Sequence, residues 1–286
     1  MSDRLAVLPQ YLLPKRLLTE LAGRAASARL GDLTHAAIRR FVARYGVDMS
    51  EAANPDITSY ASFNDFFTRP LREGARPLAQ ADYVCPVDGA ISQFGPIERG
   101  QIFQAKGHHY SATALLAGDA ELAAQFDDGQ FATLYLSPRD YHRIHMPCAG
   151  RLLRMSYVPG ELFSVNPATA RGVPGLFARN ERVVCVFDTV RGPFVLVLVG
   201  ATIVGSMATV WHGVVNPPRG QEVTSWYYDE NDETPGVQLA QGDEMGRFLL
   251  GSTVVLLWPH GTLRFNPAWA PGGPVRMGQM MGRALG

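Results

Sequence analysis

The sequence predicts an α+β protein in which N-terminal amphipathic helices precede a mainly antiparallel β domain of barrel or sandwich type. Apolar residues recur at helical spacing over residues 10–46. After Pro70 the chain changes to short β-prone runs separated by Gly and Pro. Because helical segments do not alternate with these runs, we expect a sandwich or barrel rather than repeated βα units.

The composition is that of a globular protein that can bury a large core. Of the 286 residues, 47% are hydrophobic and 18% are charged. The formal net charge is zero, so no overall field would recruit nucleic acid, and we expect no nucleic-acid partner. The strongest apolar run, Phe194–Val204, is too short to span a bilayer and predicts a buried strand.

The N-terminal helical segment is amphipathic and basic. Its apolar positions are Leu12, Leu13, Leu17, Leu18, Leu21, Ile38, Phe41, Val42 and Tyr45. Up to Arg44 the segment holds eight Lys and Arg residues against three Asp and Glu residues. Such a segment can lie on an anionic membrane surface. The alternative is a helical hairpin that is docked on its own domain, with its arginines in water.

The β-prone runs have the length and composition of strands. They are Ala90–Phe94, Phe131–Leu136, Leu152–Val158, Val183–Phe187, Phe194–Val204, Ala208–Val215 and Thr253–Trp258. Between them, Ala112–Phe126 predicts one internal helix. Residues 216–240 are polar and predict an exposed excursion.

Cysteine and lysine usage limits the chemistry. Cys85, Cys148 and Cys185 have no CxxC spacing, which argues against a disulfide framework and a thiolate zinc site. Only Lys15 and Lys106 are lysines. If the protein forms imines, this scarcity favours a carbonyl on the protein and an amine on the substrate.

Three polar residues are candidates for proton transfer. Asp88 follows Pro86 and Val87 at a predicted turn, where aspartate commonly caps the backbone. His142 and His145 are either structural or, because histidine titrates near neutral pH, catalytic bases.

A metal site at the two histidines is not expected. A His-x-x-His pair can bind zinc on a helix, but Pro138 and Pro147 bracket a run too short for one. A third ligand at suitable spacing is not evident in the sequence.

The step Gly251-Ser252 lies inside the apolar stretch Phe248–Trp258. By itself such a step indicates a bulge or bend in a strand. Ser206 is a competing serine, expected to end the strand before it. The sequence has neither a Gly-x-Ser-x-Gly elbow nor a Gly-x-x-x-x-Gly-Lys loop, which disfavours the usual hydrolases and nucleotide-binding proteins.

Several long motifs together resemble the bacterial-type phosphatidylserine decarboxylase proenzymes, from about Phe63–Arg69 to Gly278-Gln279. The motifs are Pro86–Gly89, Leu136–Pro147, Tyr157–Gly160, Phe163–Asn166, Leu176–Arg182 and Leu250–Thr253. They occur in the order of that family, which makes the resemblance specific.

The resemblance implies an inactive precursor that cuts itself between Gly251 and Ser252. Residues 1–251 would be the beta chain and residues 252–286 the alpha chain. Asp88, His145 and Ser252 would form an Asp-His-Ser triad in which the aspartate fixes the imidazole tautomer and His145 removes the hydroxyl proton. The implied domains are a membrane-associating helical segment, 1–62, and a β-rich catalytic domain, 63–286.

The resemblance also implies the reaction and its cofactor. Ser252 would become a covalent pyruvoyl group, which forms a Schiff base with phosphatidylserine and yields phosphatidylethanolamine, a step of phospholipid biosynthesis. His142 would handle the substrate carboxylate or a proton, and Arg179, Arg182 or Arg276 could meet the phosphate. A homodimer, peripheral on the cytoplasmic side of the cell membrane, is expected.

Three other functions stay open. The first is a serine hydrolase that uses Asp88, His145 and Ser252 in trans. The second is a non-catalytic, membrane-binding β domain. The third is a pyruvoyl decarboxylase for a soluble amino acid, which the basic amphipathic N-terminus disfavours.

Overall fold

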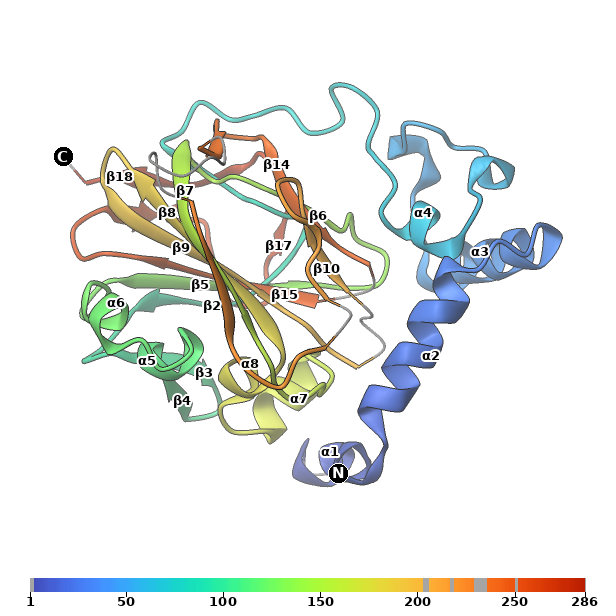
Figure 1. The fold of residues 1–286 in the computed structure, drawn as a ribbon. Coiled ribbons are helices and arrows are strands. Elements are labelled where there is room, and N and C mark those ends of the chain that lie inside the picture. Colours follow the sequence, from blue (N-terminus) through green and yellow to red (C-terminus); the bar gives the residue numbers. More distant parts are fainter. Residues whose placement is uncertain (1–2, 203–205, 217–218, 229–235, 250–251, 286) are drawn as a thin grey trace.

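The computed structural model describes residues 3–202, 206–216, 219–228, 236–249 and 252–285. Its α-helices are α1 (Asp3–Leu12), α2 (Lys15–Ser27), α3 (Asp32–Tyr45), α4 (Phe63–Phe67), α5 (Ala112–Leu115), α6 (Ala120–Ala124), α7 (Pro167–Gly172) and α8 (Leu176–Arg179). Short 3-10 turns at Met49–Glu51 and Ile57–Ser59 join α3 to α4. Helices therefore dominate up to Phe67, and strands dominate afterwards, which confirms the α+β class (Figure 1).

The strands form antiparallel sheets, and none of the described sheets closes into a barrel. The largest sheet has the order β12-β7-β8-β9-β15-β5-β2-β17, with β13 also paired to β7. Its strands are β2 (Gly89–Pro96), β5 (Gln130–Leu136), β7 (Gly150–Val158), β8 (Arg182–Thr189), β9 (Gly192–Val199), β12 (Thr224–Tyr227), β13 (Gln238–Leu239), β15 (Ser252–Trp258) and β17 (Pro274–Val275).

Three smaller sheets complete the domain, in the orders β11-β10-β14-β6, β1-β18-β16 and β3-β4. Their strands are β1 (Tyr83–Val84), β3 (Gln101–Ala105), β4 (His108–Ser111), β6 (Arg143–His145), β10 (Met207–Thr209), β11 (Gly213–Val214), β14 (Glu244–Phe248), β16 (Leu263–Phe265) and β18 (Met280–Ala284).

The core lies around β15, which runs between β9 and β5. Every residue of β15 is buried, and so is the stretch from Phe194 to Val199 of β9. Continuous apolar runs suit strands whose two faces are both covered. The predicted strand at Thr253–Trp258 is therefore confirmed, and the run Phe194–Val204 is confirmed as a strand as far as Val199; residues 200–202 are not strand, and residues 203–205 lie outside the described residues.

The predicted internal helix over Ala112–Phe126 is wrong. The structure has two short helices, α5 and α6, with Ala117 and Gly118 between them at φ angles of 66° and 89°. A left-handed backbone cannot continue an α-helix. Asp119 then begins α6, because its side chain accepts a hydrogen bond from the backbone N–H of Leu122.

The N-terminal helices lie along one side of the β domain, and α2 runs from α1 toward α3 and α4 (Figure 1). Polar contacts fasten α1 and the start of α2 to the domain. The Gln10 side chain donates to Thr169 Oγ1 (3.1 Å) and accepts from the Ser164 N–H (2.9 Å). Lys15 Nζ lies 3.0 Å from Glu161 Oε2. No helix among the described residues is both long and apolar enough to cross a bilayer.

Helices α3 and α4 share a small core of their own. It contains Ile38, Val47, Tyr60, Phe66 and Phe67, all buried. Phe66 and Phe67 are therefore core residues rather than apolar contacts with an outside surface. The cluster joins residues on both sides of the expected boundary at residue 62.

Candidate functional site

The candidate residues meet at one end of the large sheet because of its register. Strands β2 and β15 are both antiparallel to β5, so both begin where β5 ends. Ser252 pairs with Leu136, and Ala90 pairs with Tyr135, which places Asp88 just outside the start of β2. The chain leaves β5 at Leu136 and reaches His142 and β6 within a few residues.

Asp88 lies at this end, next to the point where the backbones of β2 and β5 come very close together. A Cβ at Gly89 would collide with the carbonyl oxygen of Tyr135, so only glycine lets β2 start this close to β5. Asp88 is buried, with 10% of its side chain exposed. Oδ1 accepts hydrogen bonds from Arg76 Nε (2.9 Å) and the Met277 N–H (2.8 Å), and Oδ2 accepts from Arg76 Nη2.

His145 is buried in β6 and bonded through both ring nitrogens. Nδ1 lies 2.8 Å from the Gly242 carbonyl oxygen, and Nε2 lies 3.0 Å from the Tyr141 hydroxyl. Because a carbonyl oxygen only accepts, Nδ1 carries the proton and Nε2 accepts from the tyrosine. Burial lowers the pKa of His145 below its ordinary value, so the ring is a neutral base with its lone pair on Nε2.

His142 precedes β6 and is fully buried. Its Nδ1 lies 2.7 Å from the Asp140 carbonyl oxygen, and its ring centroid lies 4.1 Å from that of Phe67. Burial lowers the pKa of His142 to about 3. Among the described residues, its Nε2 has no hydrogen-bond partner. The imidazole is thus neutral and presents an unused lone pair.

Ser252 is the first residue of β15 and is 1% exposed. Its hydroxyl also has no hydrogen-bond partner within the described part of the chain. A buried hydroxyl without a partner costs free energy, so this position calls for an explanation, of which catalysis is one. Gly251 and Leu250 lie outside the described residues.

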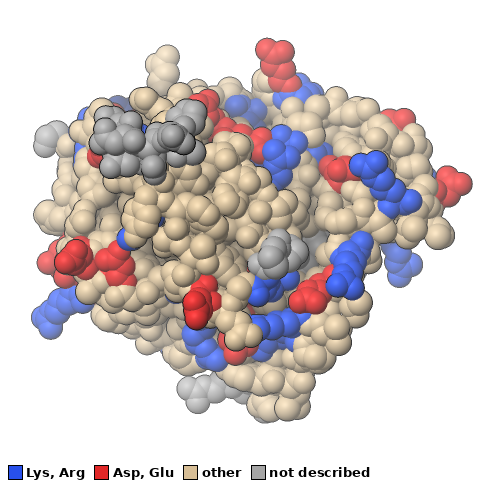
Figure 2. Space-filling model, viewed as in Figure 1, with Lys and Arg blue, Asp and Glu red and all other residues tan. Residues whose placement is uncertain are grey.

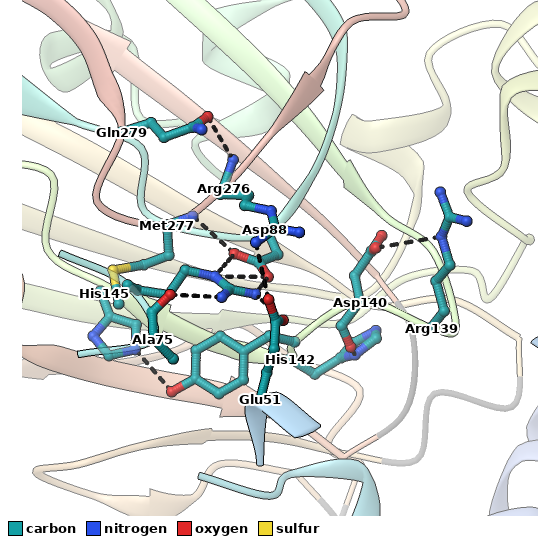
Figure 3. A network of polar contacts seen from close by, with 12 residues as sticks. Glu51, Ala75, Asp88, Arg139, Asp140, His142, His145, Arg276, Met277 and Gln279 are labelled. Atoms are coloured by element: carbon teal, nitrogen blue, oxygen red, sulfur yellow. Dashed lines mark hydrogen bonds and ion pairs between the residues drawn. The ribbon is translucent and has the colours of Figure 1, made fainter. Parts of the chain in front are cut away.

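The structure gathers the four predicted residues at one sheet end without joining them into a hydrogen-bonded triad. Asp88 is bonded to Arg76 and Met277 rather than to His145, and the Gly242 carbonyl takes the place on Nδ1 that a triad aspartate would have. Figure 3 shows Asp88 between His145 on one side and His142 with Asp140 on the other.

Arg76, Glu51 and Tyr141 also belong to this site, although the sequence did not point to them. Arg76 Nη2 lies 2.6 Å from Glu51 Oε2 as well as bonding Asp88. Neither Arg76 nor Glu51 belongs to a local sequence pattern that would indicate a contact with Asp88 or its partners. Tyr141 stands four residues before His145, and its position inside the motif was the one available signal.

The three arginines predicted as candidates for the substrate phosphate differ in their burial and in their hydrogen-bond partners. Arg182 is buried, and its guanidinium donates to the carbonyls of Leu115, Ala114, Ala178 and Asn180, so its role is structural. Arg276 Nη1 lies 2.9 Å from Glu51 Oε1. Arg179 is exposed, with its guanidinium carbon 5.1 Å from the Phe163 ring centroid.

Two cavities flank α2. One, of about 920 Å³, is lined by Lys15, Arg16 and Leu17 of the helix and by Phe163 and Arg179 of the β domain. The other, of about 590 Å³, is lined by α2 residues such as Thr19 and Arg24 and by Ser206 and Leu249. Leu249 precedes Ser252 by three residues in the sequence.

The structure offers no metal centre within its described residues: no group of three or more His, Cys, Asp or Glu side chains is placed to hold an ion. All three cysteines are free thiols. The predicted side chains at this sheet end are a buried hydroxyl, two neutral imidazoles and a carboxylate.

Comparison with known proteins identifies the family. A family model described as phosphatidylserine decarboxylase matches residues 63–283, and a second, described as PSD, matches residues 5–46. The phosphatidylserine decarboxylase proenzyme of Azoarcus sp. (strain BH72) is 74% identical over 282 residues, 99% of this chain and 96% of that protein. That of Acidovorax ebreus (strain TPSY) is 73% identical over the full length of both chains. The chain therefore belongs to the phosphatidylserine decarboxylase family, whose members are carboxy-lyases.

Proposed function

We propose that this protein cuts itself between Gly251 and Ser252, converts Ser252 into a pyruvoyl group, and decarboxylates phosphatidylserine to phosphatidylethanolamine. The observation that carries the proposal is the Ser252 hydroxyl, which is buried and unpartnered among the described residues at the start of the central strand. Family membership supplies the reaction class, and the relatives' names as proenzymes fit a precursor that is processed.

The self-cleavage that we propose begins with attack of Ser252 Oγ on the Gly251 carbonyl carbon. Nε2 of His145 takes the hydroxyl proton, and the peptide bond becomes an ester between Gly251 and the serine oxygen. β-Elimination breaks that ester and leaves residue 252 as dehydroalanine, which hydrolyses to a pyruvoyl group and ammonia. For this, His145 must exchange its Tyr141 partner for the serine hydroxyl.

The residues present fit the pyruvoyl group, since position 252 is enclosed and its side-chain oxygen has no competing partner in the described chain. Once formed, the group supplies a ketone that condenses with the substrate amine and accepts the electron pair released as carbon dioxide leaves. His142 would then offer its Nε2 to the substrate carboxylate or carry a proton, because that atom is unpaired and near neutral pH unprotonated.

The N-terminal helices support a lipid substrate. Of the 16 large hydrophobic side chains that are exposed among the described residues, 10 lie in the first 45. The most exposed leucines are Leu12, Leu33, Leu30, Leu17, Leu8 and Leu21. Figure 2 shows basic side chains, with acidic ones among them, over the part of the surface where α2 and α3 lie. An apolar, basic surface of this kind suits the interface of an anionic bilayer.

We propose that these helices attach the protein peripherally to the cytoplasmic face of the cell membrane and that the substrate reaches Ser252 along the cavities beside α2. Arg179 is our first candidate for the substrate phosphate, because it is exposed and lines the first of these cavities, whereas Arg182 is buried and bonded to backbone carbonyls. A homodimer stays a prediction, to be tested by light scattering of the purified protein.

The decisive experiment is the intact mass of the purified protein. We expect two fragments, residues 1–251 and a C-terminal piece that starts with a pyruvoyl group and lacks a normal amino terminus. Ser252→Ala and His145→Ala should stay single chains, whereas Ser206→Ala should be cut like the parent. Efficient cleavage of the Ser252→Ala chain would contradict the proposal.

A second arm separates the competing hydrolase. A serine hydrolase acting in trans would stay intact and be labelled at Ser252 by a fluorophosphonate.

The role of His142 has its own test: His142→Ala should self-cleave but release carbon dioxide from phosphatidylserine far more slowly, by roughly a hundredfold. Decarboxylation at the parent rate would exclude that role.

A further inference from the structure

The Tyr141 hydroxyl is bonded to the atom of His145 that the proposed cleavage needs as a base. Its oxygen lies 3.0 Å from His145 Nε2, while Nδ1 of the same ring donates to the Gly242 carbonyl oxygen at 2.8 Å. Burial raises the pKa of Tyr141, so the phenol keeps its proton and is the donor. A neutral imidazole has one lone pair in the ring plane, and the tyrosine occupies it.

A hydrogen-bonded turn places Tyr141 beside His145. The Asp140 carboxylate accepts from the backbone N–H and the hydroxyl of Ser137, both at 2.7 Å. The Asp140 N–H donates back to the Ser137 carbonyl oxygen (3.0 Å). Tyr141 follows this turn directly, and its ring centroid lies 5.7 Å from that of His145. The turn therefore fixes where the tyrosine backbone lies and leaves the side chain to rotate.

His145 is held more firmly than its tyrosine partner. Its backbone N–H donates to the Pro86 carbonyl oxygen (2.8 Å), and turning its ring would break the bond from Nδ1 to Gly242. Among the described residues, the Tyr141 hydroxyl bonds His145 and no other group. Rotation of the tyrosine thus breaks fewer hydrogen bonds than rotation of the histidine.

Tyr141 also has room to rotate. It lines a cavity of about 330 Å³ together with charged side chains, among them Arg69, Asp88 and Asp140. A hydroxyl that turns into this cavity exchanges the imidazole for charged groups or water. Releasing Nε2 therefore does not leave the phenol oxygen buried without a partner, which would cost free energy.

The nucleophile is unpaired as well. The Ser252 hydroxyl is buried and has no hydrogen-bond partner within the described part of the chain. The structure thus shows a base whose lone pair is occupied and a nucleophile whose proton has no acceptor. Both features belong to a precursor before its cleavage.

We infer that Tyr141 is a gate on self-cleavage: its hydroxyl caps Nε2 of His145, and the cut follows when the tyrosine turns into the polar cavity. The tyrosine keeps its proton throughout, and the proton that Nε2 then takes is that of the Ser252 hydroxyl. This inference rests on the proposed self-cleavage and adds to it a step that sets its rate.

The test compares rates of self-cleavage in full-length chains made in a cell-free system and followed by intact mass. Tyr141→Phe removes the hydroxyl and keeps the ring, so Nε2 is uncapped and cleavage should be faster by roughly three- to tenfold, the worth of one hydrogen bond. A chain with 3-fluorotyrosine at position 141 carries a more acidic phenol and a stronger donor, and should cleave more slowly than the parent.

Tyr83→Phe is the matched control. Tyr83 is also buried, and its hydroxyl donates to the Thr262 carbonyl oxygen (3.4 Å) away from the site, so this variant should cleave at the parent rate. A second measurement uses the uncut Ser252→Ala chain. Adding Tyr141→Phe should move the nitrogen-15 resonance of His145 Nε2 to higher chemical shift and leave that of Nδ1 in place, because the bond to Gly242 remains.

The opposite results are distinct. If Tyr141 instead relays a proton to His145, Tyr141→Phe becomes the slowest chain; that order, or equal rates in the three chains, overturns the inference. So does an Nε2 resonance that does not move. If Tyr141→Phe does not fold, the fluorotyrosine chain decides alone, and a rate at or above that of the parent overturns the gate. A parent chain that stays uncut, although its Nε2 resonance responds as expected, refutes the proposed self-cleavage itself.

Discussion

The first 45 residues and the strands around Ser252 deal with hydrophobic side chains in opposite ways. All seven residues of β15 are buried, and its neighbours β9 and β5 cover it on both edges. In α1 and α2, by contrast, Leu12 is 84% and Leu17 55% exposed. One region completes its own core, and the other leaves an apolar surface open.

The exposed leucines of α1 and α2 mark the part of the molecule for which we propose a lipid contact. Helices α1 and α2 are held to the rest of the protein by hydrogen bonds of Gln10 and Ser27 and by an ion pair of Lys15. Several of their leucine side chains are exposed. A helix held this way keeps a fixed position on the domain yet can still bury its outer face in a lipid interface. The β domain then provides a rigid sheet end on which the buried hydroxyl of Ser252 is placed.

The largest effect should come from the core side of this comparison. Leu256→Ala removes a fully buried side chain from the middle of β15, between Leu196 and Ala132 of the neighbouring strands. We expect a loss of about 2–5 kcal/mol in the free energy of unfolding, from lost burial and the cavity left behind. Urea unfolding should be measured in a Ser252→Ala background, so that the chain stays whole.

Leu17→Ala on α2 is the matched control, because it deletes the same atoms from an exposed position. Its free energy of unfolding should change by no more than about 0.5 kcal/mol. A large loss at Leu17 would mean that the apolar face of α2 is packed in solution, and the contrast between the two regions would break down.

The second effect concerns the open surface. Replacing Leu12, Leu17 and Leu21 by serine should weaken binding to vesicles of anionic phospholipid by roughly a hundredfold, since each side chain loses part of its transfer free energy from water. Sedimentation with vesicles measures this, and self-cleavage should be unaffected. Replacing the exposed Val190, Val210 and Val223 of the β domain in the same way should leave binding unchanged; equal losses in both variants would place the contact elsewhere.

The features that could be predicted from the sequence are the local ones. The strands β5, β9 and β15 follow from their apolar runs, and the helical segment follows from its spacing, because both patterns are local. The partners of Asp88 could not be predicted. Arg76 and Met277 lie in loops and Glu51 ends a 3-10 turn, and contacts between such separate segments leave no periodic signal.

The candidate site was predictable as a set of residues but not as a geometry. Asp88, His142, His145 and Ser252 were found through motifs, and the register of β2, β5 and β15 brings them to one sheet end. That the Gly242 carbonyl, rather than Asp88, contacts His145 Nδ1 depends on a backbone atom, which no residue type reveals. The split of the predicted helix at Ala117 likewise depends on a local backbone conformation.

A third prediction uses the buried imidazole of His142. The unfolded chain binds a proton there below about pH 6.5, whereas the folded protein does so only near pH 3. Between these values the unfolded state holds more protons, so stability falls as the pH falls, by at most about 1.4 kcal/mol per pH unit for one group. We compare the Ser252→Ala chain with the Ser252→Ala/His142→Gln chain. Between pH 6.5 and 4.5 the free energy of unfolding of the second chain should fall less than that of the first.

Equal slopes of stability against pH in the His142 variant and its parent would show that the ring is accessible to protons in the folded state. The sheet end around Ser252 would then be more open than its burial indicates.

The smallest effect tests where the two regions meet. Arg179 lies on the β domain but lines the cavity that Lys15 and Leu17 of α2 close from the other side. If its guanidinium holds the substrate phosphate, Arg179→Gln should raise KM for phosphatidylserine about fivefold, the loss of one charge-assisted hydrogen bond, with self-cleavage unaffected. Arg191→Gln, an exposed arginine at the β8–β9 turn, serves as the control. An unchanged KM would move the phosphate to the other side of α2, where Arg24 lines the second cavity beside Leu249.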